Sequence, residues 1–360
     1  MPNPAQNTPS ENLLVVMPTW LGDCVMATPT LRALRGRYPD ARITALVRHD
    51  IRPILDGLDS VDRILSVRQR DKDGSKKKTR RRRSLVALAR RLSKGGFDTA
   101  VLLPNSFKSA ALVSVAAIPR RVGYDRDGRG MLLTDRLIPR RHRGKFLPVS
   151  TLDYYLGLAR YLGAEDTDHA MELATRPESD EAALKKLRGA GFDPDQGELL
   201  LINPGAQKAM KRWPAERFGA LVDTTAERLG LTPAVTGSPA EREVLDAVIA
   251  AAKTPVLDLP KLGMDLHRLK SVVKMSRLMV TNDTGPRHIA AAFDTPVVTL
   301  FGPTTPQWTQ IGFEDEVQVT PASRSASEPA TMEQITVEQV VDAVCTLHTR
   351  TAGKPIGHGA

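Results

Sequence analysis

The sequence predicts an α/β protein built from two Rossmann-like halves, each a doubly wound parallel sheet covered by helices. Three observations support this fold class. A length of 360 residues fits two domains of ordinary size. Short apolar runs typical of buried strands alternate with longer segments of helical periodicity in both parts of the chain. The segment Arg176-Pro177-Glu178-Ser179 has the composition of a linker between the two parts.

The first domain is expected to span residues 1–176 and to open with a β-α-β unit. A short apolar run follows the N-terminus, a helical segment comes next, and a second apolar run follows Pro39-Asp40. The strands expected in this domain are 13–17, 42–47, 63–67 and 99–103, and the helices are 23–38, 84–93 and a segment from Thr151.

The second domain, expected over residues 177–336, alternates more regularly. Its predicted strands are 198–202, 233–236, 256–259, 278–281 and 297–301, and its predicted helices are 215–229, 240–252, 265–275 and 285–293. Five strands joined by four helices form a doubly wound sheet by themselves. Residues 320–331 should form a flexible polar loop, residues 337–347 a closing helix, and residues 348–360 a disordered tail.

The charge of the chain is concentrated in one segment. Lys and Arg number 51 against 41 Asp and Glu, a formal net charge of +10. The stretch Arg68–Arg83 holds ten basic residues and two acids and so carries +8, which leaves about +2 for the remainder. We interpret residues 68–83 as a solvated basic loop or helix extension that contacts anionic lipid headgroups or a phosphorylated acceptor. Nucleic acid is an unlikely partner because no aromatic residues interleave with these charges.

Several classes of protein are excluded or disfavoured by what the sequence lacks. Two cysteines cannot form a disulfide framework or a cysteine zinc module. The motifs GxGxxG, GxxxxGK[ST] and GxSxG are absent, which disfavours a dehydrogenase, a P-loop NTPase and a serine hydrolase. No His, Asp and Glu cluster has metal-ligand spacing. There is neither a membrane-spanning run nor a signal peptide at the N-terminus, so we expect a cytoplasmic protein.

In open parallel sheets, ligands bind beyond the carboxyl ends of the strands, so the loops there are the candidate sites. The first of these loops, Met17–Asp23, ends in a carboxylate. Asp23 could serve only as a helix N-cap, for which Asp is well suited. It could instead accept a proton from a substrate hydroxyl.

The second and third loops precede helices in the other half of the chain. Residues 203–214 carry three cations before a helix start and suit either phosphate binding or a solvated surface loop. Residues 281–288 lead into a helix capped by Asp283 or Thr284, with further donors on Arg287 and His288. His288 could equally be a structural histidine. One α/β domain thus has a carboxylate, and the other has helix N-termini that can bind phosphate. This combination suits transfer from a nucleotide-activated donor.

Five motifs carry a resemblance to a known family. They are Pro18-Thr19-Trp20-Leu21-Gly22-Asp23, residues 103–110, residues 118–124, Lys211-Arg212-Trp213-Pro214 and residues 282–290. In this order they resemble the ADP-heptose:lipopolysaccharide heptosyltransferases, glycosyltransferase family nine, and most of all the heptosyltransferase II group. The resemblance covers about residues 13–347. It implies a GT-B fold with two domains facing a cleft, and an inverting, metal-independent transfer of heptose from ADP-L-glycero-D-manno-heptose to an inner-core lipopolysaccharide acceptor, with no cofactor.

The resemblance also implies roles for single residues. Asp23 matches the catalytic base, and a helix N-terminus should lower its pKa and keep it ionised. Lys211 matches the lysine on the donor phosphates, and Glu241 falls where the nucleoside is held. The remaining matches are Asp283, Thr284, Gly285 and His288 along the donor, and Asn105, Ser106 and Lys108 on the acceptor side.

Two departures from the family pattern leave the acceptor open. The basic residues 72–83 are an insertion, and residues 320–331 lack the cysteines often found there. One alternative is a related GT-B transferase that uses a different nucleotide sugar or acceptor. The other is a non-enzymatic basic protein that binds membranes or nucleic acid. For a lipid-linked acceptor, the resemblance implies a peripheral position at the inner face of the inner membrane.

Overall fold

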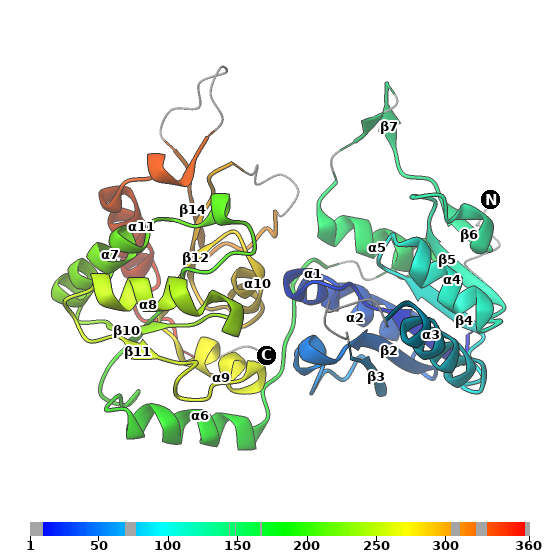
Figure 1. The fold of residues 1–360 in the computed structure, drawn as a ribbon, viewed down its shortest axis with the longest axis horizontal. Coiled ribbons are helices and arrows are strands. Elements are labelled where there is room, and N and C mark those ends of the chain that lie inside the picture. The colour runs from blue at the N-terminus through cyan, green and yellow to red at the C-terminus, as the bar shows by residue number, and fades with distance from the viewer. Residues whose placement is uncertain are drawn as a thin grey trace. The chain divides into compact units, whose positions relative to one another are not determined.

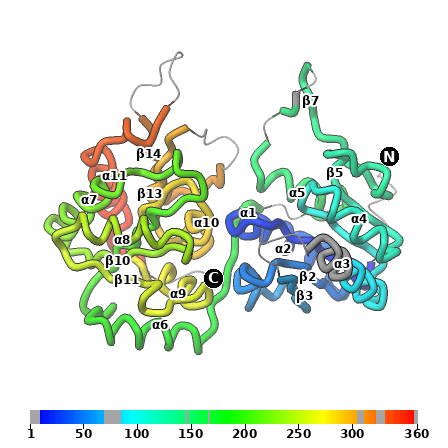
Figure 2. The backbone as a smooth tube through the Cα atoms, viewed as in Figure 1, coloured from blue at the N-terminus to red at the C-terminus, as the bar shows by residue number. Residues whose placement is uncertain are grey.

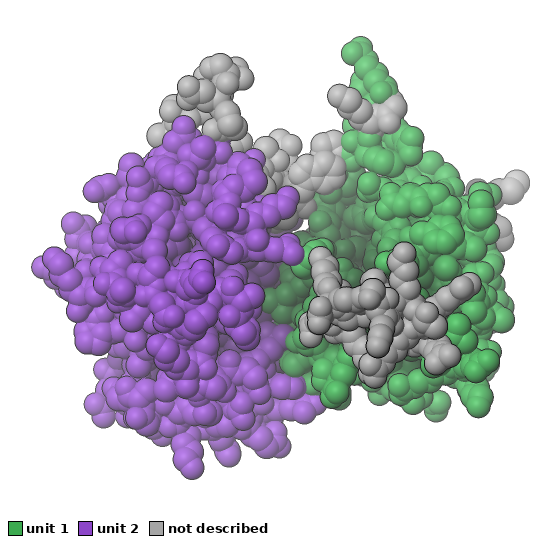
Figure 3. Space-filling model, in the orientation of Figure 1, with its two compact units in different colours: residues 1–169 green, residues 170–360 purple. Residues whose placement is uncertain are grey.

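The computed structural model describes residues 10–68, 77–143, 145–147, 149–165, 168–303, 310–321 and 330–356. The side chains of residues 77–84 and 145 are not among the described parts. The chain divides into two compact units, residues 1–169 and 170–360, and each is considered by itself (Figure 3). Within the described residues, no helix is both long and apolar enough to cross a bilayer.

Unit 1 contains a parallel six-stranded sheet in the order β3-β2-β1-β4-β5-β6 (Figure 1). Its strands are β1 Asn12–Val16, β2 Arg42–Arg48, β3 Arg63–Val67, β4 Thr99–Leu102, β5 Arg120–Tyr124 and β6 Asp135–Leu137. Its helices are α1 Leu21–Met26, α2 Thr28–Arg37, α3 Lys77–Ser93, α4 Phe107–Val115 and α5 Thr151–Tyr161, with 3₁₀ turns η2 His49–Ile54 and η3 Gly130–Leu132. Helices α3 and α4 pack on one face of the sheet, and α1, α2 and α5 pack together on the other.

The single helix expected over residues 23–38 is wrong, because the structure has two helices there. α1 begins at Leu21, and α2 begins at Thr28 after a break at Ala27. Pro29 explains the break, since proline lacks an amide hydrogen and its ring disfavours helical backbone before it. The Thr28 hydroxyl donates instead to the carbonyl of Val25, at 2.8 Å.

In the basic run the helix-extension alternative is correct for residues 77–83, whereas the β5–α5 region contains strands that the sequence did not predict. α3 begins at Lys77 rather than at Ser84, so the second half of the run 68–83 extends that helix, while residues 69–76 lie outside the described residues. Strands β5 and β6 complete the sheet. A short antiparallel hairpin, β7 Arg141–His142 and β8 Lys145–Phe146, projects away from the sheet of unit 1.

Unit 2 repeats the same topology, with a parallel sheet in the order β11-β10-β9-β12-β13-β14. Its strands are β9 Leu199–Asn203, β10 Thr232–Val235, β11 Leu257–Asp258, β12 Leu278–Asn282, β13 Val297–Leu300 and β14 Glu316–Val319. Its helices are α6 Pro177–Gly189, α7 Ala215–Leu229, α8 Arg242–Ala251, α9 Leu266–Met275, α10 Gly285–Ala292 and α11 Val337–Arg350, with 3₁₀ turns η4 Ala209–Lys211, η5 Pro239–Glu241 and η7 Met332–Gln334. The sixth strand, β14, was not predicted.

The C-terminal helix belongs to unit 2 and packs on α7, β13 and β14 (Figure 2). Its N-cap Thr336 forms a capping box with Gln339, which satisfies amides at the helix start. The expectation of a disordered tail from residue 348 is wrong for residues 348–356. The helix continues to Arg350, Thr351 is buried, and the Lys354 Nζ atom lies 2.6 Å from the Asp315 carboxylate. Residues 357–360, and residues 322–329 of the expected polar loop, lie outside the described residues.

Candidate functional site

Both sheets have the strand order 3-2-1-4-5-6, which creates a topological switch point between the first and fourth strands. In unit 1 the switch point lies between β1 and β4, and in unit 2 between β9 and β12. Asp23 follows β1, and the acceptor-side candidates Asn105, Ser106 and Lys108 follow β4. Lys211 follows β9, and Asp283 to His288 follow β12. The candidates therefore gather where an α/β sheet of this topology binds its ligand.

Asp23 lies in the first turn of α1 and is largely shielded from solvent. It is not the N-cap, since that position is Trp20, so the purely structural capping interpretation is wrong. Among the described residues no side chain donates a hydrogen bond to its carboxylate. Burial raises the pKa of Asp23 from 3.8 to about 6. The predicted lowering by a helix terminus is wrong, because α1 has only six residues and desolvation exceeds its effect.

Of the three acceptor-side candidates, two are engaged within unit 1. The Asn105 Oδ1 atom accepts hydrogen bonds from the Tyr154 hydroxyl at 3.0 Å and from Arg129 Nη2 at 3.2 Å. Ser106 is the N-cap of α4, and its Oγ atom accepts from the amide of Ser109. Lys108, in the first turn of α4, is exposed. Lys108 is thus the candidate with a charge available to a ligand.

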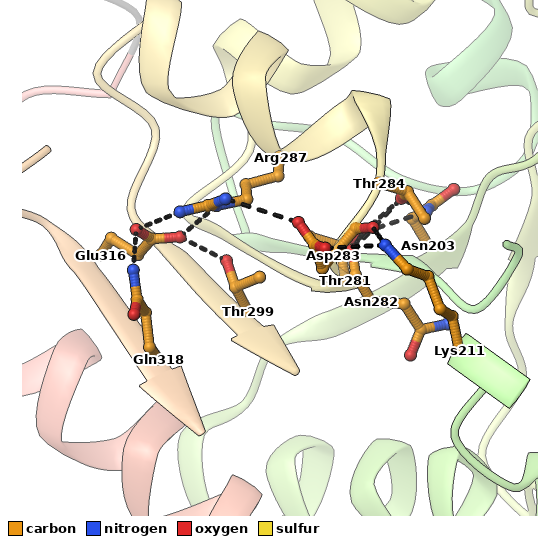
Figure 4. A network of polar contacts seen from close by, with 10 residues as sticks. All are labelled: Asn203, Lys211, Thr281, Asn282, Asp283, Thr284, Arg287, Thr299, Glu316 and Gln318. Atoms are coloured by element: carbon orange, nitrogen blue, oxygen red, sulfur yellow. Dashed lines mark hydrogen bonds and ion pairs between the residues drawn. The ribbon is translucent and has the colours of Figure 1, made fainter. Parts of the chain in front are cut away.

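Lys211 and Asp283 form an ion pair across the switch point of unit 2 (Figure 4). The Lys211 Nζ atom lies 2.8 Å from Asp283 Oδ2 and 3.4 Å from the Asp283 carbonyl oxygen. Burial acts to raise the pKa of Asp283, but the hydrogen bond from Lys211 and the nearby cations hold it below its usual value. Asp283 is therefore a buried, ionised partner of Lys211 rather than a helix cap.

Two asparagines join the loop after β9 to the loop after β12. The Asn203 Nδ2 atom donates to Thr284 Oγ1 at 3.0 Å, and the Asn282 Nδ2 atom donates to the Pro204 carbonyl at 2.8 Å. Thr284 is the N-cap of α10 by position, although its side chain makes no capping bond. Gly285 and Pro286 open the helix, so its first amides have no acceptor within the helix and can bind an anion.

His288 is buried behind this helix start. Burial, with the charge of Arg287, lowers the pKa of His288 to about 3, so the imidazole is neutral. Its Nδ1 atom has no hydrogen-bond partner among the described residues. A neutral imidazole with an unused nitrogen can donate to or accept from a ligand, but it cannot supply a positive charge to a phosphate at neutral pH.

Glu241 is brought to the same edge of unit 2 by a capping box at η5. Its Oε2 atom accepts from the amide and hydroxyl of Ser238, at 2.8 and 2.7 Å. The carboxylate lies against Gly205 in the loop after β9, where an added Cβ atom would be 2.3 Å from Glu241 Oε1. A side chain at position 205 would therefore displace the Glu241 carboxylate from its place.

The sequence interpretation was wrong about Arg287 and gave no role to Glu316. Arg287 is completely buried and binds the Glu316 carboxylate in a bidentate ion pair, so its side chain offers no donor to a ligand. Arg129, the buried partner of Asn105, was also missed. The spacing of Asp283 and Arg287, four residues apart on a helix start, could have suggested their contact, whereas Glu316 lies in a strand that the sequence did not predict.

No three His, Cys, Asp or Glu side chains of the described segments gather where they could hold a metal ion. What the geometry offers is a poorly solvated carboxylate in unit 1. In unit 2 it offers a lysine, a helix N-terminus and a neutral histidine. Two doubly wound sheets with these groups at their switch points are typical of the GT-B fold and suit a transferase that uses a nucleotide-activated donor.

Comparison with known proteins agrees with this class. The model of glycosyltransferase family 9 (heptosyltransferase) matches residues 85–338, and the chain belongs to this family of glycosyltransferases. It is 29% identical over 306 residues to the lipopolysaccharide heptosyltransferase 2 of Salmonella typhimurium, covering 82% of this chain and 84% of the relative.

Two solved structures share the fold of the whole chain. One is a family 9 glycosyl transferase from Veillonella parvula, with a TM-score of 0.82, 22% identity, and coverage of 94% of this chain and 97% of that one. The other is the Escherichia coli ADP-heptose lps heptosyltransferase II, with a TM-score of 0.78, 23% identity, and coverage of 95% and 100%. The expectations of family nine and of the GT-B fold are confirmed.

Proposed function

We propose that the protein transfers heptose, with inversion and without a metal or cofactor, from ADP-L-glycero-D-manno-heptose to an inner-core lipopolysaccharide acceptor. The observation that carries this proposal is the pairing of Lys211 with Asp283 beside the N-terminus of α10, at the switch point of unit 2. A diphosphate is complementary to a lysine and to the backbone amides of Gly285, Arg287 and His288 at the start of α10. The family relationship supports heptose as the transferred sugar.

The donor side accounts for departure of the nucleotide. When the bond between the sugar and the β-phosphate breaks, negative charge accumulates on the leaving ADP. Lys211 and the first amides of α10 stabilise that charge where it develops, an effect that commonly gives the largest part of catalysis. Thr284, Gly285 and His288 line the diphosphate, and Glu241, fixed by Ser238, binds the nucleoside.

Asp23 is the general base on the acceptor side. Inversion needs one carboxylate that accepts the proton of the attacking hydroxyl while the leaving group departs from the opposite face of the sugar. A carboxyl whose pKa is about 6 is ionised at neutral pH, yet it is a stronger proton acceptor than a solvated aspartate. Lys108 and the loop of Asn105 and Ser106 then orient an anionic acceptor.

The Lys211 role is tested by calorimetric titration with ADP. Lys211→Ala should weaken ADP binding about tenfold or more, because a hydrogen bond to a charged group is lost. Lys208→Ala is the matched control, because Lys208 is an exposed lysine in the same loop. Equal ADP affinity in the Lys211→Ala variant and the parent protein would remove Lys211 from the donor site.

The sugar and acceptor are tested by a thermal-shift panel of ADP, UDP and GDP sugars, followed by mass spectrometry of the product. Stabilisation by ADP-heptose and a product heavier by one heptose are expected. Stabilisation by a UDP or GDP sugar would favour the alternative, a related transferase with another donor. Lack of response to every nucleotide sugar would favour a non-enzymatic role.

A lipid-linked acceptor places the protein in the cytoplasm and in peripheral contact with the inner membrane face, through the basic run 68–83. Deleting residues 72–83 should weaken sedimentation with vesicles containing phosphatidylglycerol, more strongly at low salt, and leave ADP affinity unchanged. The hairpin provides the comparison, because Arg140 and Arg143 are exposed and no acid occurs between residues 138 and 150. If Arg140→Gln with Arg143→Gln weakens vesicle binding and the deletion does not, the contact belongs to the hairpin.

A further inference from the structure

Arg287 is a buried arginine that is held between two carboxylates (Figure 4). Its Nε and Nη2 atoms contact the two oxygens of Glu316 at 2.5 and 2.8 Å, and its Nη1 atom lies 3.5 Å from Asp283 Oδ1. No part of its side chain is exposed. A guanidinium in this position cannot reach a ligand, so any effect on the reaction must pass through the groups that it contacts.

Glu316 keeps Arg287 in place. The Thr299 hydroxyl donates to Oε1 of Glu316 at 2.6 Å, and the Gln318 amide donates to Oε2 at 2.9 Å. Both oxygens of the carboxylate are therefore satisfied on the side away from the switch point. The bidentate geometry fixes the plane of the guanidinium and directs Nη1 toward Asp283.

Asp283 therefore has two cationic partners that differ in exposure. Lys211 is 24% exposed and Arg287 is not exposed at all, while Asp283 is 7% exposed. The charges of this cluster cancel, since the cations Lys211 and Arg287 face the carboxylates of Asp283 and Glu316. If Lys211 turned toward an anionic ligand and Asp283 had no other partner, a buried carboxylate would be left uncompensated, which is strongly unfavourable.

We propose that Arg287, held by Glu316, is a positioning residue that keeps Asp283 compensated while Lys211 exchanges that carboxylate for the diphosphate of the donor. This inference rests on the function proposed above for Lys211. Lys211, which is partly exposed, can leave Asp283 for the diphosphate because the buried Arg287 stays in contact with Asp283. Without Arg287, Asp283 would compete with the diphosphate for Lys211, and donor binding would weaken.

The test is a double-mutant cycle read by calorimetric titration with ADP at neutral pH. Arg287→Met together with Glu316→Gln removes the buried pair without leaving a lone charge, and it should lower ADP affinity about tenfold. In a protein that also carries Asp283→Asn, the same double change should alter ADP affinity less than twofold. A merely structural role of Arg287 would weaken binding equally in both backgrounds, and that result would overturn the inference.

A milder variant keeps the test decisive if the double variant does not fold. Arg287→Lys retains the charge but cannot form the bidentate pair, so it should lower ADP affinity less than the double change does. That loss should also disappear with Asp283→Asn. Lys211→Ala distinguishes the proposed donor site from the proposed role of Arg287. Unchanged ADP binding in this variant refutes the donor site. Weakened ADP binding in this variant, together with no coupling between Arg287 and Asp283 in the cycle, refutes only the role of Arg287.

Discussion

Replacing Asp23 by asparagine should make the folded protein more stable, by an amount that grows as the pH rises from about 4 to about 6. The pKa of this carboxyl rises from 3.8 to about 6 on folding because burial disfavours its charged form. About two pKa units correspond to ~3 kcal/mol between the two protonation states. Since the side chain retains some solvent contact, this figure is an upper limit for the gain in unfolding free energy.

The sign of the pH dependence follows from the raised pKa. Below about pH 4 the carboxyl is neutral in both the folded and unfolded chains, so the Asp23→Asn variant and the parent protein should be equally stable. Between about pH 4 and pH 6 the unfolded chain loses this proton first, which lowers the stability of the parent protein. Above about pH 6 both states are ionised, and the advantage of the variant should stay constant.

Urea unfolding of both proteins, followed by circular dichroism at several pH values from about 4 to about 8, measures this difference. Asp40→Asn is a suitable control, because Asp40 is an exposed carboxylate in the same unit and its replacement should give no such trend. A variant that is less stable than the parent at pH 7 would refute the reasoning, because it would mean that the folded state stabilises the charge. The same raised pKa predicts that kcat/KM of the parent protein increases as the pH rises through about 6.

Two further substitutions test the core and the nucleoside side of unit 2. Trp213→Ala should lower the free energy of unfolding by about 3–5 kcal/mol, as measured in urea, because the buried indole packs edge-on against Phe218 and donates to the Ile335 carbonyl. Gly205→Ala should weaken ADP binding in calorimetry more than it weakens the fold, because the new Cβ atom displaces Glu241; unchanged ADP affinity would place the nucleoside elsewhere.

The helices α7 to α11 of unit 2 and the central strands could be predicted from sequence because their local signals agree with their burial. α7 occupies residues 215–229 as expected, since its amphipathic pattern ends at Gly230, whose φ of 67° is the left-handed conformation that favours glycine. β1 and β9 are buried in the centres of their sheets and are continuous apolar runs.

Two of the four edge strands, β6 and β14, could not be predicted because their sequences look like loops. β6 has three residues with Asp135 at its start, and β14 begins with Glu316. Each carboxylate is tolerated because an arginine from a neighbouring element binds it: Arg120 in β5 for Asp135, and Arg287 in α10 for Glu316. Such ion pairs form only in the tertiary structure, so no local sequence pattern predicts them.

For the candidate site residues, too, the sequence predicts the type of side chain but not its tertiary contacts. The sequence picks out Asp23, Lys211 and Asp283 as candidates by residue type and by their position after strands. It does not reveal that Arg287 faces Glu316 rather than a ligand, because that contact requires β14. The expectation of a lowered pKa for Asp23 failed for a quantitative reason. A helix terminus contributes about 0.3–1 kcal/mol, whereas the burial of this carboxyl corresponds to ~3 kcal/mol.

The two aspartates are distinguished by their partners. Asp283 is buried but faces Lys211 and Arg287, so its pKa is held below the usual value and it remains a fixed negative charge. Asp23 is shielded, and in the described part of the chain burial alone accounts for its raised pKa of about 6, so it can gain and lose a proton close to neutral pH. Carboxyl groups whose environments shift their pKa values apart commonly divide the tasks of a reaction. This contrast favours Asp23 as the proton acceptor and Asp283 as the group that organises the donor site.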